Sequence, residues 1–503
     1  MKKNVLSLSI TAALVGLGFS GGAQAIVAIP LGTATALQLS TDGVGHFLYV
    51  PYYSAQSNNN TMINLVNTDT TNGKAVKVRF RGASNSDDVF DFQVFLSPGD
   101  VWTASVSKNA AGLASLHTTD NSCTKPNKAT LNSTPFVTAR LDTARRTGDA
   151  LANETREGYV EIFNMADIPP GTPLFTAIKH VNSVPPCTGA AWTALDTDPA
   201  DLTAALADGL NFPTTGLMAD WIILNVVNAG AWSQRAVAIS ANDATRTPAK
   251  GNLVYFPQTA GAFNGLISNY TADPVLNAHP SMAAMYDTPD MSIPYLSNGS
   301  TLPVNQVSAL SGAIATNNIY NEFLTDSATN STTDWVLSMP TRRYSVAMDY
   351  KASGGSARVY STLPTQYFNS TNTAVIDGQV CVLGITPQQW DREENTPQNP
   401  SQVIISPNVP GSPSATCGEA NVMSVNNGNT ASVSGLIIDP SGTLQATVAR
   451  SDQENGYAAG WISLATPGLG NGLPILGYAA LRATAGVSTF GATWEHKTNR
   501  IQK

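Results

Sequence analysis

Short runs in which apolar and polar residues alternate recur along most of the chain. In VFDFQVFL (89–96), every second residue from Phe90 onward is apolar, so we expect a β-strand with one row of side chains in a core and a mostly polar row outside. The SPGD that follows is typical of a type II turn, and VWTASV (101–106) is then the return strand of a hairpin. Trp102 on that strand is predicted to pack in the core.

Other segments carry the same signature and are separated mostly by Gly, Pro, Asn or Asp. Short strands with such spacing are typical of β-sandwiches. The further strands expected are residues 46–50, 61–67, 74–81, 159–163, 221–228, 235–240, 334–339, 343–350, 374–383 and 477–481.

One helix is predicted in DTDPADLTAALADGL (196–210). Asp198 is a suitable N-cap, Pro199 suits the first helical position, and Gly209 can end the helix. The sequence therefore predicts an all-β protein with two or more immunoglobulin-like antiparallel β-sandwich regions, long loops and one or two short helices.

Two segments share a pattern that suggests how the chain is divided. In INLVNTDTTNGKAVKV (63–78) and LNVVNAGAWSQRAVAI (224–239), an asparagine precedes a basic residue by ten positions: Asn64 and Lys74, then Asn225 and Arg235. Any hairpin with an outward basic residue gives the same pattern, so duplication and coincidence both remain open. We expect an N-terminal β-sandwich region over residues 26–200 and a C-terminal β-rich region over 201–503.

The first 25 residues have the features of a secretory signal peptide. Lys2 and Lys3 precede an apolar run, and the small-residue sequence AQA ends at Ala25, after which we expect cleavage. GxGxxG-like and GxSxG-like strings occur inside this segment and would be removed with it. The protein is therefore predicted to be exported, to the cell surface or the extracellular space.

The charge of the chain excludes some partners. Removal of Lys2 and Lys3 changes the formal net charge from −8 to −10, which argues against a nucleic-acid partner. Charged residues make up 12% of the chain, compared with about 25% in typical soluble domains. A surface rich in small uncharged residues suits a chain that packs against copies of itself.

Four cysteines in an exported chain indicate two disulfides. The count permits three pairings. We favour Cys123 with Cys187 and Cys381 with Cys417, because each bond would close a proline-rich or polar excursion of the chain.

No motif supports catalysis, and the protein is predicted not to be an enzyme. The histidines stand singly, outside any metal-ligand spacing, and each is expected to be structural or solvent-facing: His46, His117, His180, His279 and His496. On the strand of residues 74–81, Lys77, Arg79 and Arg81 alternate with apolar residues. Together with Asp87 and Asp88 they predict a polar outer sheet face with opposite charges across strands.

Calcium is the one cofactor whose ligand chemistry fits these loops, because it takes several oxygen ligands in irregular geometry. One candidate set is Asp196, Asp198 and Asp201, although helix capping is the favoured role for this set. The second candidate set, in WDREEN, is Asp391, Glu393 and Glu394.

Several strings resemble one family of exported proteins. Residues 47–107, EGYVEIFNMADIP (157–169), TDWVLSMPTRRY (333–344) and FGATWEHK (490–497) resemble surface-layer proteins of Gram-negative bacteria, of the type that forms the sheath of nanopods. These strings are strand and turn signatures and supply no site residue.

The resemblance implies a lattice subunit that associates with itself on the outer-membrane surface, with calcium-assisted assembly. The alternative is a secreted adhesin, or a carbohydrate-binding or hydrolytic protein, whose site is dispersed over several loops.

Overall fold

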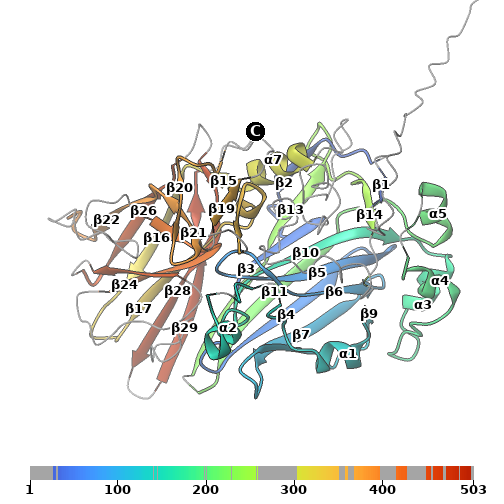
Figure 1. Cartoon of the computed structure of the whole chain (residues 1–503), viewed down its shortest axis with the longest axis horizontal. Helices are drawn as coiled ribbons and strands as arrows, with labels where there is room; N and C mark the ends of the chain where they lie inside the picture. Colours follow the sequence, from blue (N-terminus) through green and yellow to red (C-terminus); the bar gives the residue numbers. More distant parts are fainter. Residues whose placement is uncertain are drawn as a thin grey trace, which may run out of the picture.

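The chain folds into two β-sandwiches that lie side by side (Figure 1). The computed structural model describes residues 27–29, 32–255 (except 140, 144, 198, 200 and 228), 258, 303–350, 357–360, 367–396, 415–426, 449–454, 457–467, 472–485 and 488–499. Strands are the main regular structure, and nearly all of them pair antiparallel. The predicted all-β fold is confirmed, whereas an immunoglobulin-like topology stays a prediction.

The first sandwich packs a seven-stranded sheet against a five-stranded sheet. The seven-stranded sheet has the order β2 (Ala36–Leu39), β13 (Val237–Asn242), β3 (Phe47–Ser54), β10 (Glu157–Ile168), β5 (Gly73–Gly82), β6 (Asp88–Leu96) and β9 (Cys123–Lys125). The five-stranded sheet has the order β12 (Gly230–Arg235), β11 (Leu217–Asn225), β4 (Asn59–Asn67), β7 (Val101–Lys108) and β8 (Ala114–His117). A separate pair is formed by β1 (Val27–Ile29) and β14 (Leu253–Tyr255).

This sandwich continues well past residue 200. Strand β11 pairs with β4, and β13 pairs with β3, so residues 217–242 complete both sheets. The predicted boundary between residues 200 and 201 therefore falls inside a sandwich. The two segments with similar sequence also differ in structure, because β11 and β12 form a hairpin within one sheet, whereas β4 and β5 belong to different sheets.

The segment from β6 to β7 connects the two sheets, and the predicted hairpin is wrong. Strand β6 pairs with β5 and β9, while β7 pairs with β4 and β8. The turn itself forms as predicted: the Asp100 N–H donates to the Ser97 carbonyl at 3.1 Å, and Gly99 has φ of 71°. The two strands face each other across the core, where the rings of Phe92 and Trp102 lie 5.3 Å apart.

Both faces of the seven-stranded sheet are covered. Phe92 and Gln93 point to opposite faces of β6, yet both are fully buried, and Gln93 accepts a hydrogen bond from the Tyr255 hydroxyl at 3.2 Å. The face opposite the five-stranded sheet packs against β14 and several helices: α3 (Pro173–Ile178), α4 (Ala190–Ala194), α5 (Leu202–Ala207) and α7 (Pro303–Ile314). The prediction that this polar row faces solvent is therefore wrong. Its buried polar side chains form hydrogen bonds within the protein instead.

The described residues contain more helices than predicted. Besides α5, the structure has α3, α4, α7, α1 (Lys128–Ser133) and α2 (Gly148–Asn153). The predicted helix corresponds to α5, but its N-cap is Asp201, whose side chain accepts from the Ala204 N–H at 2.9 Å. Asp198, the predicted cap, lies outside the described residues.

The second sandwich packs a five-stranded sheet against a four-stranded sheet. The five-stranded sheet has the order β25 (Ala449–Glu454), β24 (Ala420–Asn426), β17 (Thr332–Ser338), β28 (Leu476–Ala485) and β29 (Ser488–Glu495), with β24 and β25 parallel. The four-stranded sheet has the order β22 (Thr386–Asp391), β26 (Ala459–Ala465), β16 (Asn318–Leu324) and β30 (Lys497–Thr498).

Smaller elements surround these sheets. They are a three-stranded sheet of β20 (Thr373–Ile376), β21 (Gln379–Leu383) and β23 (Ala415–Cys417), the pair β18 (Val346–Asp349) and β19 (Ala357–Tyr360), the pair β15 (Ala315–Thr316) and β27 (Leu473–Pro474), and the 3₁₀ turn η3 (Arg342–Tyr344). The single strand predicted over residues 374–383 is thus the hairpin β20–β21. Its turn is Asp377-Gly378, and both residues have positive φ, as a type I′ turn requires.

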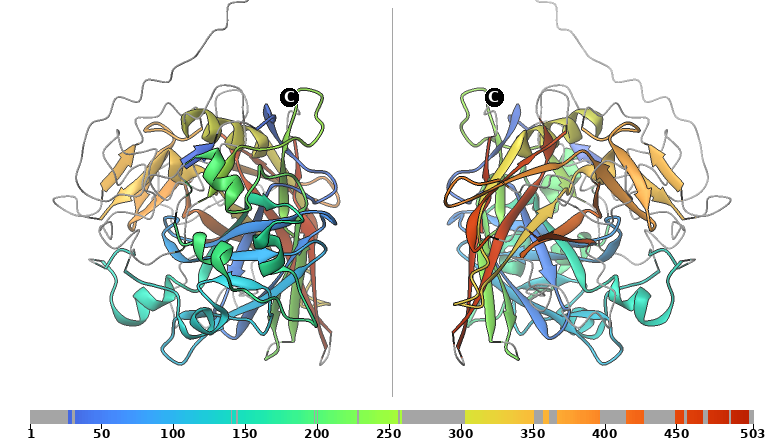
Figure 2. Two further views of the ribbon diagram at one scale, coloured as in Figure 1. Left: turned by 90° about the vertical axis from the view of Figure 1, so that its right-hand side faces the viewer. Right: turned by 90° about the vertical axis from the view of Figure 1, so that its left-hand side faces the viewer.

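The five-stranded sheet of the second sandwich is buried on both faces. Trp335 and Leu337 of β17 point into the core of the second sandwich, while Val336 between them points into the core of the first. Tyr478 of β28 packs beside Trp221 of the first sandwich, with ring centroids 4.7 Å apart. The two views in Figure 2 show the strands of both sandwiches packed into one body. The two cores therefore share one sheet.

Both favoured disulfides are confirmed. Cys123 of β9 bonds to Cys187, and Cys381 of β21 bonds to its cross-strand neighbour Cys417 of β23. Stable disulfides are typical of proteins outside the cytoplasm.

We predict that Phe92→Ala lowers the free energy of unfolding by about 3–5 kcal/mol, because the cavity it leaves is enclosed by both sheets. Thr103→Ala on β7 is the control, since Thr103 is exposed on the outward face of the other sheet. Chemical denaturation of both variants measures the difference. Equal midpoints for the two variants would contradict the packing described here.

Candidate functional site: an ionic cluster between the sandwiches

Charged side chains of β5 are buried on the face of the seven-stranded sheet that points away from the five-stranded sheet. Lys77, Arg79 and Arg81 are at most 1% exposed, so the predicted solvent-facing surface is wrong. The expected pairing of opposite charges does occur, with Arg79 Nε lying 3.6 Å from Asp88 Oδ2. The alternating pattern correctly placed the three residues on one face of the strand. It could not show that segments distant in sequence cover that face.

Glu161 of β10 connects the two sandwiches. Its Oε2 lies 3.3 Å from Arg81 Nε within the first sandwich, and its Oε1 accepts from Arg343 Nη2 of η3 at 2.7 Å. All three side chains are at most 1% exposed. Arg343 also donates to the hydroxyl of Tyr344 at 2.5 Å and lies over its ring. One carboxylate is thus shared by guanidinium groups from both halves of the chain.

A second buried pair, Arg342 and Glu419, lies next to the first. Arg342 also donates to the Gly418 carbonyl at 3.0 Å, and the Arg343 N–H donates to Glu419 Oε1 at 3.0 Å. Burial raises the pKa of Glu419 above its usual value, and the positive charge of Arg342 opposes that shift. We call Arg81, Glu161, Arg342, Arg343 and Glu419 the ionic cluster.

The loop after β5 completes the contact with the second sandwich. Asn85 accepts from the Val380 N–H at 3.1 Å and donates to the Gly378 carbonyl at 2.9 Å. The Tyr350 hydroxyl donates to Asp87 Oδ2 at 2.7 Å. The sequence predicted only a turn here. Because these groups and the ionic cluster are enclosed by protein, their role is to fix the relative position of the sandwiches.

The described histidines are placed as structural or surface residues. His46 accepts from the Ala241 N–H at 3.1 Å and donates to the Ala249 carbonyl at 2.9 Å, and burial lowers its pKa to about 3. The imidazole of His496 is buried 3.0 Å from the Val336 carbonyl. The remaining ones are His180, which lies 3.4 Å from Asp100, His117, which is exposed on β8, and His279, which lies outside the described residues.

The described carboxylates predicted as calcium ligands mostly form ion pairs or hydrogen bonds with nearby groups. Asp196 pairs with Lys125 at 2.6 Å, and Asp201 caps α5. Asp391 accepts from the N–H groups of Glu393 and Asn395, and the Asn395 side chain lowers its pKa below the usual value. Glu393 pairs with Arg392, and Glu394 is exposed in the same loop.

Among the described residues, no group of three or more His, Cys, Asp or Glu could hold a metal ion.

The outward face of the first sandwich's five-stranded sheet is broad and nearly uncharged. Met62, Val101, Ile222 and Leu224 lie on it among small polar residues. Within its strands, apart from His117 on β8 and Lys108 at the end of β7, the only outward acidic or basic residues are Asp220 and Arg235, which are opposite each other in register. We call this surface the flat face.

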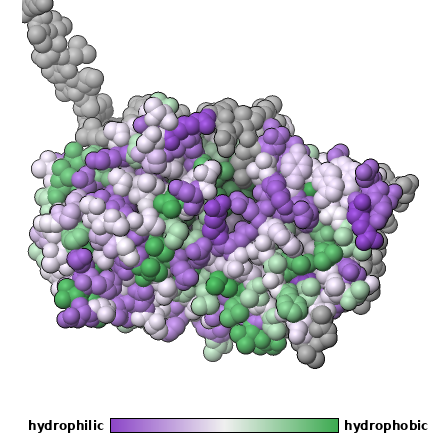
Figure 3. All heavy atoms as spheres, turned by 180° about the vertical axis from the view of Figure 1, so that it is seen from behind, coloured by the Kyte–Doolittle hydropathy of each residue, from purple (hydrophilic) through white to green (hydrophobic). Residues whose placement is uncertain are grey.

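The flat face continues towards the second sandwich. The Trp232 indole N–H of β12 donates to the Leu481 carbonyl at 2.9 Å, and Thr493 of β29 donates to the Ser233 carbonyl. In Figure 2, the strands of residues 217–235 (green) and 476–498 (red) stand on one side of the molecule. Figure 3 looks onto that side, where hydrophilic (purple), weakly polar (white) and hydrophobic (green) residues are interspersed.

Comparison with known proteins adds no relative: no protein-family model matches the sequence, and no curated protein is significantly similar to it. Within the described part of the chain, no helix is long and apolar enough to cross a membrane.

We predict that Glu161→Gln lowers the free energy of unfolding by about 3–5 kcal/mol, because the buried guanidinium groups of Arg81 and Arg343 then lose the carboxylate that they share. The control is Glu495→Gln, which removes a surface pair with Arg235 whose side chains are about half exposed. Thermal unfolding should shift for the first variant and stay unchanged for the second. If both shifts were equally small, the ionic cluster would not stabilise the contact between the sandwiches.

Proposed function

We propose that the chain is a structural surface-layer subunit, which is exported and assembles with copies of itself into an array or sheath on the outer surface of a Gram-negative cell. The sequence strings that resemble nanopod-sheath proteins support this role. So do the signal-like N-terminal sequence and the two disulfides, which suit an oxidising environment.

The observation that carries the proposal is the charge of the flat face. The chain has a formal net charge of −8, so most encounters between copies are opposed by repulsion. On the flat face, Asp220 is opposite Arg235, which also pairs with Glu495 at the edge of the face, so few charges are present and copies meet little repulsion there. Five strands spaced about 4.8 Å apart give a surface about 20 Å wide, comparable in scale to one side of a specific protein interface.

Exposed apolar residues lie at one end of the flat face. Val226 and Val227, in the turn between β11 and β12, are 75% and 72% exposed, and Phe490 on β29 is 61% exposed. Gly491 packs directly against Ala231 of β12, which brings the two strands together at this end. Exposed apolar groups of this kind favour burial against another molecule.

One observation favours the alternative role of carbohydrate binding. Trp390 and Trp461 stack across β22 and β26 with ring centroids 4.1 Å apart, and Trp461 is 40% exposed. Exposed aromatic rings can stack against the apolar faces of sugars. A purified protein that remains a monomer and binds glycans, with binding lost in Trp461→Ala, would favour this alternative.

We predict that the double variant Met62→Glu and Ile222→Glu prevents assembly, because it adds two negative charges at opposed positions of the flat face. Val184→Glu is the control, since Val184 is 53% exposed in a loop outside the flat face. Electron microscopy and light scattering should show arrays for the wild type and the control only. If the double variant formed arrays, the flat face would not be part of the interface between copies.

We predict that assembly requires calcium in the millimolar range, which is typical of weak extracellular sites, and that a chelator reverses it at constant ionic strength. The ions would bridge carboxylates of facing copies, such as Glu393 and Glu394, so Glu393→Gln with Glu394→Gln should raise the calcium requirement. Sodium chloride at matched ionic strength supplies only screening. Equal assembly in sodium chloride would rule out bridging.

A further inference from the structure

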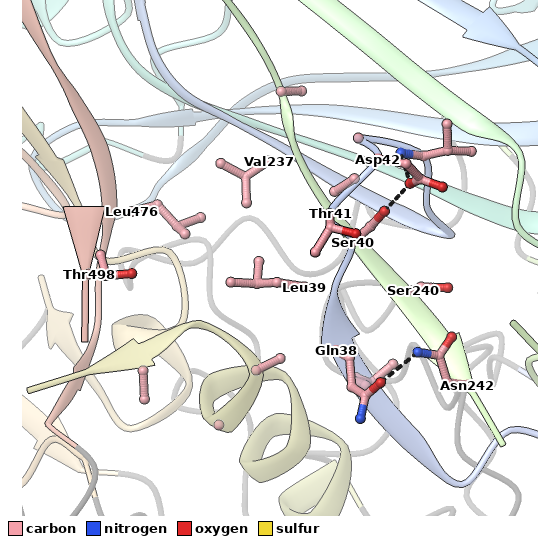
Figure 4. A pocket seen from close by; sticks show the side chains of 18 of the residues that line it. Gln38, Leu39, Ser40, Thr41, Asp42, Val237, Ser240, Asn242, Leu476 and Thr498 are labelled. Atoms are coloured by element: carbon pink, nitrogen blue, oxygen red, sulfur yellow. Dashed lines mark hydrogen bonds between the residues drawn. The ribbon is translucent and has the colours of Figure 1, made fainter. Parts of the chain in front are cut away.

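A cavity of about 1150 Å³ lies between the two sandwiches. Its walls are β2 and β13 of the first sandwich, helix α7, and parts of β28 and β30 of the second sandwich (Figure 4). The self-association proposed above through the flat face does not involve this cavity. Its most informative wall is β2, because every residue from Thr35 to Val44 lines it.

Strand β2 is an edge strand with unpaired main-chain groups. Among the strands that the structure describes, it pairs only with β13, and the Ser40 N–H donates to the Ala238 carbonyl at 2.9 Å. In an antiparallel ladder, residues alternate between pointing their main-chain groups toward the partner and away from it. Leu37 and Leu39 are therefore the residues whose N–H and C=O groups point away from β13.

The register of β13 supports this assignment. Ile239 is opposite Leu39, and its carbonyl accepts from the His46 N–H on the far side at 2.9 Å. Ala241 is opposite Leu37, and its N–H donates to the His46 ring at 3.1 Å. Within the described residues no hydrogen bond is formed by the main-chain groups of Leu37 and Leu39 at the free edge. Two donors and two acceptors thus remain available there.

The walls of the cavity suit an extended chain. Figure 4 shows Leu39, Val237 and Leu476 directed toward one another from three sides. Helix α7 contributes only small residues to the lining: Ser308, Ala309, Gly312 and Ala313. A polar pair, Gln38 and Asn242, lies to one side with a hydrogen bond of 2.8 Å. The cavity thus offers apolar contact for some side chains of a strand and polar contact for others.

We propose that the free edge of β2 receives an extended segment from a second copy of this chain, which adds as the next strand of the seven-stranded sheet. The inference rests on the proposed self-assembly and names one of its contacts. Main-chain hydrogen bonds to Leu37 and Leu39 supply the affinity, as in other cases of strand addition. Among the charged lining residues, Arg235 and Arg246 balance Asp42 and Glu495, so an acidic copy meets no net repulsion.

Hydrogen exchange and one proline variant test the inference. We expect the amides of Leu37 and Leu39 to exchange at least tenfold more slowly in assembled arrays than in isolated copies. Leu39→Pro removes the N–H that points into the cavity without removing a hydrogen bond to β13. Its control, Leu39→Ala, keeps the N–H. We expect Leu39→Pro to raise the protein concentration needed for assembly at least tenfold relative to Leu39→Ala, which loses the same side chain but keeps the N–H, with similar melting temperatures for the two variants.

The outcomes separate this inference from the proposed function. Arrays in which these amides exchange as fast as in isolated copies would overturn the inference and leave self-assembly intact. So would amides that are already protected in isolated copies, because another part of the same chain would then occupy the edge. If the wild type formed no arrays in any condition, both proposals would fail. If Leu39→Pro failed to fold, hydrogen exchange of the wild type would still test whether a strand adds to β2.

Discussion

A carboxylate that is removed from water stays ionised only if positive charges and hydrogen bonds replace its hydration. Glu161 meets this requirement with Arg81 from its own sandwich and Arg343 from the other. Separation of the sandwiches would take Arg343 away from Glu161, whereas Arg81 would stay beside it. The ionic cluster therefore makes the relative position of the two sandwiches specific, in a way that apolar packing around Val336 alone would not.

The surfaces that we connect with function depend on that fixed position. The flat face reaches the second sandwich only because β29 lies against β12, where Gly491 packs on Ala231. The cavity beside β2 is lined by residues of both sandwiches, so its shape depends on their relative position. Assembly into a regular array requires identical subunits, and a rigid contact between the two halves makes every copy present the same surfaces.

The sequence predicted local structure well and long-range structure poorly. The SPGD turn and the strand character of residues 89–106 follow from short-range chemistry, and both are confirmed. Both disulfides are also confirmed, and they join cysteines that are consecutive along the chain. The pattern could not show that β6 and β7 belong to different sheets, because a turn of this type serves either connection. It also placed Arg81 in solvent, since alternation identifies two faces of a strand but not what covers each face.

The burial of these charges also changes how the composition should be interpreted. Charged residues are only 12% of the chain, and several of them, including Arg79, Arg81, Arg342 and Arg343, are buried in pairs. The surface that other molecules meet is therefore even poorer in charge than the sequence suggests. In the proposed array, contacts between copies would then derive their specificity from shape, from small polar side chains and from main-chain groups such as those of Leu37 and Leu39. Such contacts depend little on ionic strength, so a requirement for calcium would reflect direct bridging of carboxylates more than screening.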